Sequence, residues 1–225
     1  MATNTLKRAS RPTRRIASSS EGQIRAAAIE LFARRGFAAT SMRDIAKSSG
    51  LSLAGLYHHF PGKEELLYRI QEDAYERLMT PLRQLPPDMT PALKIERIIH
   101  NHVVFFAGQI TEMRVLSHEL MALGGDRGRR IGRMRHEYFA LCLQAVTGLL
   151  RGGGRRAPNA RAATMCLFGM INWIYTWYKP ERDGNPEALA RLMTQILMNG
   201  LVTAAAKAPP AGSKLQKRRI TSMAR

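Results

Sequence analysis

Two short helical patterns joined by a glycine, set between two longer ones, constrain this chain more than any other feature of its sequence. The first short pattern follows Thr40 and Ser41, either of which can cap a helix, and it ends at Gly50. The second follows Ser52 and ends before a Pro-Gly pair. Helices this short are marginal in isolation, so they must pack on the longer helices beside them. This order is that of a helix-turn-helix, and we expect residues 21–80 to fold as one unit.

The rest of the chain also follows a helical period near 3.6 residues. The sequence contains no long stretch of strict apolar–polar alternation, so it predicts an all-α fold with roughly nine helices. A Pro-rich segment at 81–91 separates the helix-turn-helix unit from the remainder. The helices expected beyond that segment cover residues 91–108, 110–123, 127–151, 158–179 and 186–205.

The helix-turn-helix segment reads GFAATSMRDIA at 36–46 and SGLSLAGLYHHFPGKEELL at 49–67. This segment closely resembles the DNA-binding domain of TetR-family transcriptional regulators. The resemblance implies a TetR-like fold, with an N-terminal helix-turn-helix domain and a C-terminal helical domain for ligand binding and dimerisation. The implied division is a disordered basic arm at 1–20, a DNA-binding domain at 21–80, a ligand-binding and dimerisation domain at 81–206 and a disordered basic tail at 207–225.

The second short helix of a helix-turn-helix lies in the major groove, and its first residues contact base edges. The resemblance implies that Lys63 and the start of the first short helix contact phosphates, that Tyr57 and His59 contact the DNA backbone, and that His58 faces bases. A packed aromatic at Tyr57 and a solvated Lys63 are the alternatives. The expected DNA-contacting residues, within the motif from Ser41 to Phe60 and just after it, are Thr40, Ser41, Met42, Arg43, Ser52, Leu53, Ala54, Gly55, Tyr57, His58, His59 and Lys63.

The start of this recognition helix, at residues 53–55, carries no Lys or Arg, the residue types that most often contact guanine. We therefore expect bases to be read by His58, by apolar contact with thymine methyl groups and through DNA shape. Arg43 and the basic arm can compensate for the missing cation. We hypothesise that the arm enters an adjacent minor groove, as short Arg-rich arms do in other helix-turn-helix proteins.

The net charge of +18 is concentrated at the two ends of the chain. Residues 1–20 carry five positive side chains and residues 207–225 carry six, with no acidic residue in either segment. Both segments lack apolar periodicity, so we expect them to be disordered. Basic arms suit a polyanion such as DNA, although they can also serve solubility alone.

The TetR resemblance implies a homodimer formed by the last two long helices. Two recognition helices about 34 Å apart would then read a two-part DNA site. The apolar residues expected on these helices, at the dimer face, are Met165, Leu167, Phe168, Ile171, Leu189, Leu192, Met193, Ile196 and Leu197.

The segment 169–180 is dense in aromatic residues and resembles a TetR subgroup that includes repressors of fatty-acid, sterol or aromatic-acid catabolism. Members of that subgroup often respond to CoA thioesters, which implies a small hydrophobic or acyl-CoA-like effector. Its two tryptophans can line a pocket or simply pack on neighbouring helices. The arginines at 127–135 can attract a phosphate-bearing ligand or form a solvated helix face. The expected ligand-binding residues are His102, Phe105, Phe106, Met113, His118, Arg135, Tyr138, Asn172, Trp173 and Trp177.

Other classes of function find little support in the sequence. It contains no Gly-rich phosphate loop, nucleophile elbow or zinc-binding helix, so we predict no enzyme, no cofactor and no metal. It contains no apolar run long enough to span a membrane and no secretory signal, so we expect a cytoplasmic protein. Cys142 and Cys166 are expected to be buried. The alternative function is an architectural or nucleoid-associated DNA-binding protein of the same fold without a ligand switch.

Overall fold

The computed structural model describes residues 20–151 and 159–207, and within these ranges the chain is all-α, as predicted. The predicted basic arm, the basic tail and the Gly152–Gly154 connector fall almost entirely outside the described residues. The described chain has nine helices longer than one turn and two four-residue helical segments. In order they are α1 (Ser20–Arg35), α2 (Met42–Ser49), α3 (Leu53–His59), α4 (Lys63–Arg83), α5 (Pro91–Ala107), α6 (Ile110–His118), α7 (Gly125–Arg151), α8 (Ala160–Asn172), α9 (Ile174–Trp177), α10 (Pro180–Asp183) and α11 (Pro186–Lys207).

Local caps define the two short helices, α2 and α3. Ser41 is the N-cap of α2, and it forms a reciprocal capping box with Asp44. Gly50 ends α2 in the left-handed conformation, with φ of 72°, which costs glycine little. The Ser52 hydroxyl accepts a hydrogen bond from the Gly55 N–H at 3.0 Å and so caps α3. The boundaries expected for both helices are confirmed.

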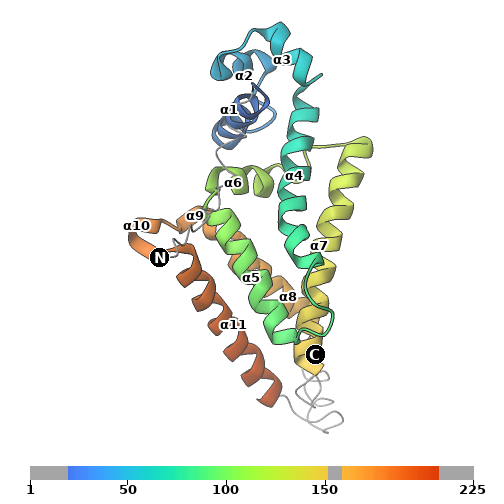
Figure 1. Cartoon of the computed structure of the whole chain (residues 1–225), viewed down its shortest axis with the longest axis vertical. Helices are drawn as coiled ribbons and strands as arrows, with labels where there is room; N and C mark the ends of the chain where they lie inside the picture. Colours follow the sequence, from blue (N-terminus) through green and yellow to red (C-terminus); the bar gives the residue numbers. More distant parts are fainter. Residues whose placement is uncertain (1–19, 152–158, 208–225) are drawn as a thin grey trace, which may run out of the picture.

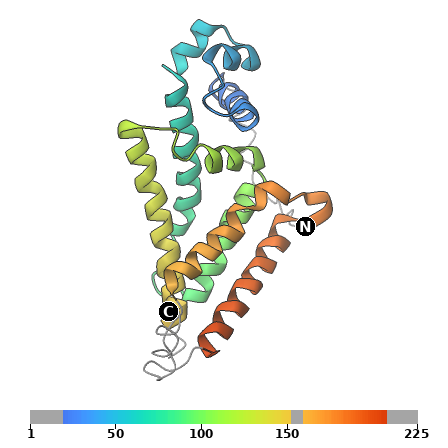
Figure 2. The ribbon, with the colours of Figure 1, turned by 180° about the vertical axis from the view of Figure 1, so that it is seen from behind.

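Helix α4 joins the helix-turn-helix unit to helices α5, α7, α8 and α11, which we call the lower body (Figures 1 and 2). It begins beside α3 and continues between α6 and α7 into the lower body. Pro81 lies inside its last turn rather than after its end. A single cluster of buried apolar side chains runs from Ile24 of α1 to Leu197 of α11, so the two parts share one continuous core.

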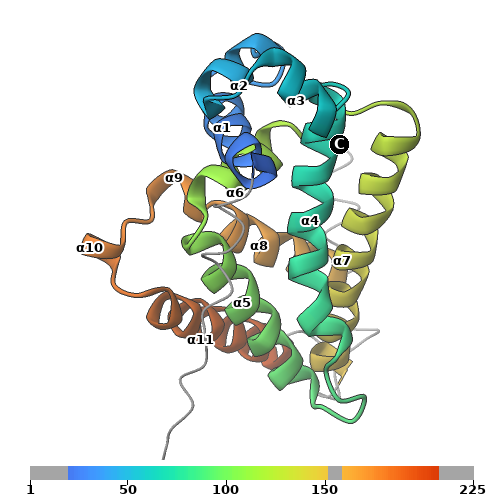
Figure 3. The same cartoon turned by 45° about the horizontal axis from the view of Figure 1, so that its top comes forward.

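The lower body is formed by α5, α7, α8 and α11, with α11 packed along α5. Helix α6 lies between α1 and α5, and thus between the helix-turn-helix unit and the lower body (Figure 3). The structure ends α6 at His118 instead of residue 123, because Glu119 leaves the helical conformation. The Gly125 turn, with φ of 57°, then begins α7.

The single helix expected at 158–179 is divided in the structure. Helix α8 ends at Asn172, and the Trp173 carbonyl accepts hydrogen bonds from both the backbone N–H and the hydroxyl of Thr176. This tight turn replaces the regular helical pattern. Pro180 then disfavours helical geometry at Lys179, which is extended. The expectation of one continuous helix was wrong.

Several residues expected at the dimer interface instead face the core of this chain. Leu189, Met193 and Leu197 follow a four-residue spacing on α11 and are buried, whereas Leu192 and Ile196 are 52% and 58% exposed. The buried residues of the expected dimer face therefore contribute to the monomer core; these are Leu167, Ile171, Leu189, Met193 and Leu197. Cys142 is buried as expected, but Cys166 is exposed, so that expectation was wrong.

Candidate DNA-binding surface and effector cavity

Helix α3 presents three polar aromatic side chains to solvent. Leu56 and Phe60 are buried and anchor the helix to the core, as expected. Tyr57, with 49% exposure, and the adjacent His58 and His59 lie on the outer side. Their exposure gives no support to the interpretation of Tyr57 as a packed aromatic, and it leaves all three side chains available to a ligand outside the domain.

The other residues expected to contact DNA differ in their exposure to solvent. Ser41, Arg43, Ser52 and Ala54 are exposed, and Leu53 and Gly55 are partly exposed. Thr40 is 1% exposed and Met42 is buried, which conflicts with their expected roles as contacts. The reason at position 40 is local, because its hydroxyl donates to the Gly36 carbonyl at 2.8 Å and its backbone N–H to the Phe37 carbonyl. Thr40 and Met42 therefore lie beneath the candidate DNA-binding surface and support it.

Ser41 and Asp44 also set the charge at the start of α2. The Asp44 carboxylate accepts hydrogen bonds from the Ser41 hydroxyl and backbone N–H, and these bonds lower the pKa of Asp44. Asp44 is therefore ionised at neutral pH. Its negative charge is partly offset by Arg35, whose guanidinium lies 3.8 Å from the carboxylate.

Lys63 has a different set of partners from the one expected. Its ammonium donates to the carbonyls of Phe37, Ala38 and Thr40, at 3.0, 3.2 and 3.2 Å. It also lies 4.6 Å from the centre of the Phe37 ring. An ammonium group has three N–H donors, so this arrangement can engage all of them. Lys63 thus ties the start of α4 to the loop between α1 and α2, and a phosphate would have to share or replace these partners.

A cavity of about 720 Å³ lies between helices α5, α7 and α8 of the lower body and the neighbouring helices α4, α6 and α9, and its size is in the range of ligand sites. Side chains from α4 to α9 line it, and most of them are apolar or aromatic. Seven of the ten expected ligand-binding residues lie along it: His102, Phe106, Met113, Arg135, Tyr138, Asn172 and Trp173.

The other three expected residues lie elsewhere. The Phe105 ring packs against the Arg77 guanidinium. His118 Nε2 is 3.1 Å from the Tyr175 hydroxyl, which itself lines the cavity. Trp177 lies one turn beyond Trp173 on α9 and does not reach the cavity, whereas Trp173 does. Lining residues that sequence reasoning missed include Tyr75 and Leu78 on α4, whose apolar period indicates only a buried helix face.

Within the cavity wall, His102 and Tyr138 form a buried polar pair. The His102 Nδ1 atom is 2.9 Å from the Tyr138 hydroxyl, and both side chains are almost fully buried. Burial lowers the pKa of His102 to about 3. His102 is therefore neutral at physiological pH and offers the cavity a polar group without a charge.

Helix α6 connects this cavity to the helix-turn-helix unit. Met113, Leu116 and Ser117 line the cavity from α6. Directly after them, the Glu119 carboxylate accepts a hydrogen bond from the Phe37 backbone N–H at 2.9 Å. The Glu119 carbonyl accepts another from the side chain of Gln71 on α4, also at 2.9 Å. A displacement of α6 would therefore be transmitted to the same loop that Lys63 holds.

A buried ion-pair network reinforces that connection. Glu112 of α6 is 5% exposed, and its carboxylate lies 2.6 Å from Arg77 of α4 and 3.9 Å from Arg25 of α1. Arg25 also pairs with Asp73 at 3.0 Å. Burial raises the pKa of Glu112, and the two arginines act against that rise. Three helices thus meet at one carboxylate.

The described ranges hold neither a metal site nor a membrane span. No group of three or more potential ligands among His, Cys, Asp and Glu gathers there to hold a metal ion. Across residues 20–151 and 159–207, no helix has both the length and the apolar character needed to cross a membrane.

Two family models match the chain. Residues 24–70 match the one described as bacterial regulatory proteins, tetR family. Residues 88–201, half of the chain, match the one described as tetracyclin repressor-like, C-terminal domain. Each match covers one of the two parts that α4 joins.

The relatives matched along most of their length are transcriptional regulators rather than enzymes. The HTH-type transcriptional repressor KstR2 of Rhodococcus jostii is 22% identical over 78% of this chain and 88% of its own. The fatty acid metabolism regulator protein of Bacillus subtilis is 22% identical over 80% of this chain and 94% of its own.

Two solved structures show the same fold. A TetR-family transcriptional regulator from Bordetella parapertussis superposes with a TM-score of 0.75 and 29% identity, covering 83% of this chain and 97% of its own. The structure of AibR in complex with isovaleryl coenzyme A and operator DNA has a TM-score of 0.69 and 25% identity, covering 80% of this chain and 98% of its own.

Proposed function

This chain belongs to the TetR family of bacterial regulatory proteins, and on that premise we propose that it is a homodimeric repressor whose release from DNA is triggered by an acyl-CoA-like effector. The observation that carries this proposal is the direct connection, through α6, between a ligand-sized cavity and the loop that positions α2 and α3. A bacterial DNA-binding regulator acts on the chromosome, so we propose a cytoplasmic location for this protein.

The exposed side of α3 supports a DNA-binding role. Tyr57, His58 and His59 are all exposed, and we assign Tyr57 and His59 to contacts with the sugar–phosphate backbone and His58 to contacts with base edges in the major groove. The exposed Arg43 on α2 adds a positive charge beside them. The positive arms at both ends of the sequence would increase affinity for any DNA.

The exposed apolar residues of α11 support dimerisation. Leu192 and Ile196 lie one turn apart and point away from the core that Leu189 and Met193 enter. Exposed large apolar side chains at helical spacing are typical of a surface that a partner covers. Pairing of α8 and α11 with their copies would hold two recognition helices at a fixed separation.

The cavity supports an effector with an apolar portion. Its wall is largely aromatic and aliphatic, with one neutral buried polar pair at His102 and Tyr138. The AibR relative was solved with isovaleryl coenzyme A, which has a short branched acyl chain. An acyl group would bury its carbon chain here and place its carbonyl within reach of a hydrogen-bond donor.

The switch would operate by a shift between two conformations. An effector that binds more tightly to the conformation with α6 displaced favours that conformation. The size of the shift depends on the difference between its affinities for the two conformations. Because Glu119 holds the Phe37 N–H and Gln71 of α4, the displacement would change the position of the helix-turn-helix. A coupling free energy of about 1–3 kcal/mol is typical of such systems.

A footprint tests this function. Full-length protein is added to the intergenic DNA upstream of its own gene, with and without CoA thioesters of increasing acyl length. We expect protection of a two-part site that one thioester class abolishes. Protection of unrelated DNA with strong salt dependence and no response to any thioester would instead indicate the architectural function.

A further inference from the structure

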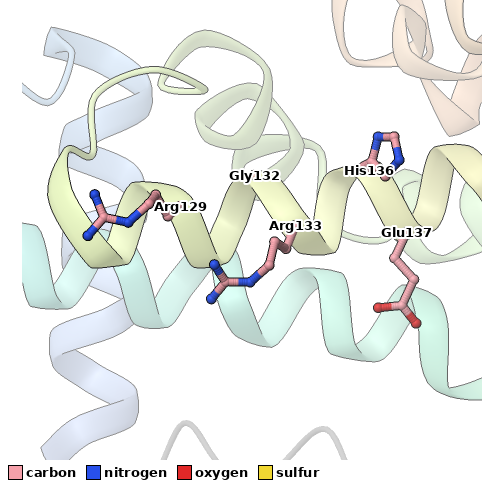
Figure 4. Close-up of a pocket in the computed structure, with 5 residues that line it drawn as sticks. All are labelled: Arg129, Gly132, Arg133, His136 and Glu137. Carbon is pink, nitrogen blue, oxygen red and sulfur yellow. The ribbon is translucent and has the colours of Figure 1, made fainter.

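The effector cavity has a mouth that is open to solvent. Three large apolar side chains line the cavity and are also exposed, Leu120, Met165 and Trp173, with exposures of 38%, 50% and 60%. The exposed His136 borders the mouth from α7 (Figure 4). An apolar ligand behind such a mouth would keep part of its surface in water, which reduces the free energy gained by burial. In a single chain the cavity is therefore incomplete.

The mouth continues into the outer face of α8. The α8 residues that line the cavity recur at helical spacing, and they are Arg161, Met165, Phe168 and Asn172. The neighbouring stripe around the helix consists of the small residues Ala162, Cys166 and Gly169, which are all exposed. Trp173 follows this stripe at the same spacing, and it also lines the cavity. The rim of the cavity and the outer face of α8 thus share one surface.

Helix α11 extends this surface. Figure 2 shows α8 on the near side of the molecule with α11 beside it, and no other helix of the described chain lies in front of them. Leu192 and Ile196 form an exposed apolar ridge on α11. The small side chains of the α8 stripe leave a shallow groove, into which a ridge of this kind can pack.

The charge pattern favours a second copy of this chain as the molecule that covers the surface. Residues 162–178 and 192–206 contain no charged side chain, although the chain as a whole has a net charge of +18. Two such basic chains repel each other, so they can associate most easily through a face without charge. A two-fold interface also places the same patch on both sides, so that the ridge of one copy meets the groove of the other. A polyanion or an acidic protein would find no row of cations here.

We propose that a second copy of this chain covers the mouth and completes the effector cavity. The inference rests on the proposed homodimer and goes beyond it, because it makes the cavity a property of the dimer rather than of one chain. Met165 and Trp173 become covered in the dimer and, with Leu120, close the apolar wall. By linkage, an effector in the cavity strengthens dimerisation by the same factor as dimerisation strengthens effector binding.

Tryptophan fluorescence tests the cover, because the sequence contains only Trp173 and Trp177. Trp177→Phe leaves Trp173 as the single reporter on the α8 side of the mouth. Leu120→Trp in a Trp173→Phe/Trp177→Phe background places a reporter on the rim that follows α6. The matched control is Leu93→Trp in the same background, at a residue 48% exposed on α5 that does not line the cavity.

Each full-length reporter is quenched with acrylamide as a dimer and after Leu192→Glu/Ile196→Glu, whose charges on α11 lie outside the cavity. We expect quenching at positions 120 and 173 to be severalfold stronger in the monomer, and quenching at position 93 to be equal in both forms. A thermal melt checks that the monomeric variant folds, and dilution of the unmutated dimer gives a second comparison. A chain that stays monomeric, or a dimer that shields position 173 but not position 120, would overturn the proposal.

Calorimetry with isovaleryl-CoA separates this inference from the proposed function. We expect the monomeric variant to bind isovaleryl-CoA about 5–150-fold more weakly than the dimer, the usual range of coupling between sites. If isovaleryl-CoA releases the operator but binds monomer and dimer equally, the effector switch stands and the shared cavity is wrong. If both rims are shielded in the dimer but no thioester affects DNA binding, the shared cavity stands and the effector switch is wrong.

Discussion

His58 is exposed on α3, the proposed recognition helix, and we propose that its side chain reads a base. If it does so, His58→Ala should weaken binding to the operator by about 1–3 kcal/mol and leave binding to random DNA nearly unchanged. Titrations on both DNAs at one salt concentration measure the difference. An equal loss on both would make His58 a phosphate contact.

Lys63 illustrates how a residue can stabilise a surface instead of forming it. Its ammonium lies against three carbonyls of the loop before α2. We expect Lys63→Met to lower the free energy of unfolding by about 1.5–3 kcal/mol, the contribution of hydrogen bonds to a charged group. Urea denaturation measures this loss. Unchanged stability with a reduced salt dependence of DNA binding would instead identify a phosphate contact.

His102 should make stability depend on pH. Because folding lowers its pKa from the ordinary value of 6.5 to about 3, the unfolded state takes up a proton first as pH falls. Its contribution to stability is thus present above pH 6.5 and decreases between pH 6.5 and about 3, by about 1.4 kcal/mol per pH unit. Denaturation of wild type and His102→Gln at pH 7.5 and 5.5 should show this extra slope only in wild type. Parallel slopes would contradict it.

Helix α6 is held by polar contacts near both of its ends, through Glu112 at its start and Glu119 just after its last residue. Arg77 compensates the buried Glu112 carboxylate. We expect Arg77→Met to cost about 3 kcal/mol, because it leaves a buried charge without its closest partner. Glu112→Gln should cost much less, and the double variant should recover part of the loss. Simple addition of the two costs would show that the pair is not coupled.

The sequence predicts some elements better than others, for a physical reason. The limits of α2 and α3 depend on Ser41, Gly50 and Ser52, whose caps act within a few residues and are visible in the sequence. The break after Asn172 is not visible, because the helical period continues through it. The Lys63 partners are backbone carbonyls, which carry no residue-type signal at all.

The residues of the candidate effector cavity also include some that the sequence predicts and some that it does not. Trp173 was expected near a pocket because residues 169–180 are dense in aromatics, and Tyr138 because the family resemblance places a pocket among the helices between 80 and 180; both line the cavity. Met165 and Phe168 were expected only at the dimer face, yet they also line the cavity. An amphipathic helix with two apolar faces does not reveal from its sequence which face meets which neighbour.

A protein with one recognition helix per chain must form a dimer to bind both halves of a two-part DNA site. Leu192→Glu/Ile196→Glu places charges on the exposed side of α11 and should give a monomer in sedimentation analysis, with loss of operator binding. Leu93→Glu, at a residue 48% exposed on α5, is the matched control and should remain dimeric. A dimeric double variant would place the interface elsewhere.

Occupation of the cavity must control DNA binding if the protein is a ligand-released repressor. The direct measurement is a titration of the protein–operator complex with isovaleryl-CoA and longer acyl-CoAs, followed by DNA fluorescence anisotropy. We predict that at least one acyl-CoA releases the operator at concentrations where free CoA does not. Anisotropy that stays at its bound value with every acyl-CoA, while calorimetry shows that one of them fills the cavity, would contradict this mechanism.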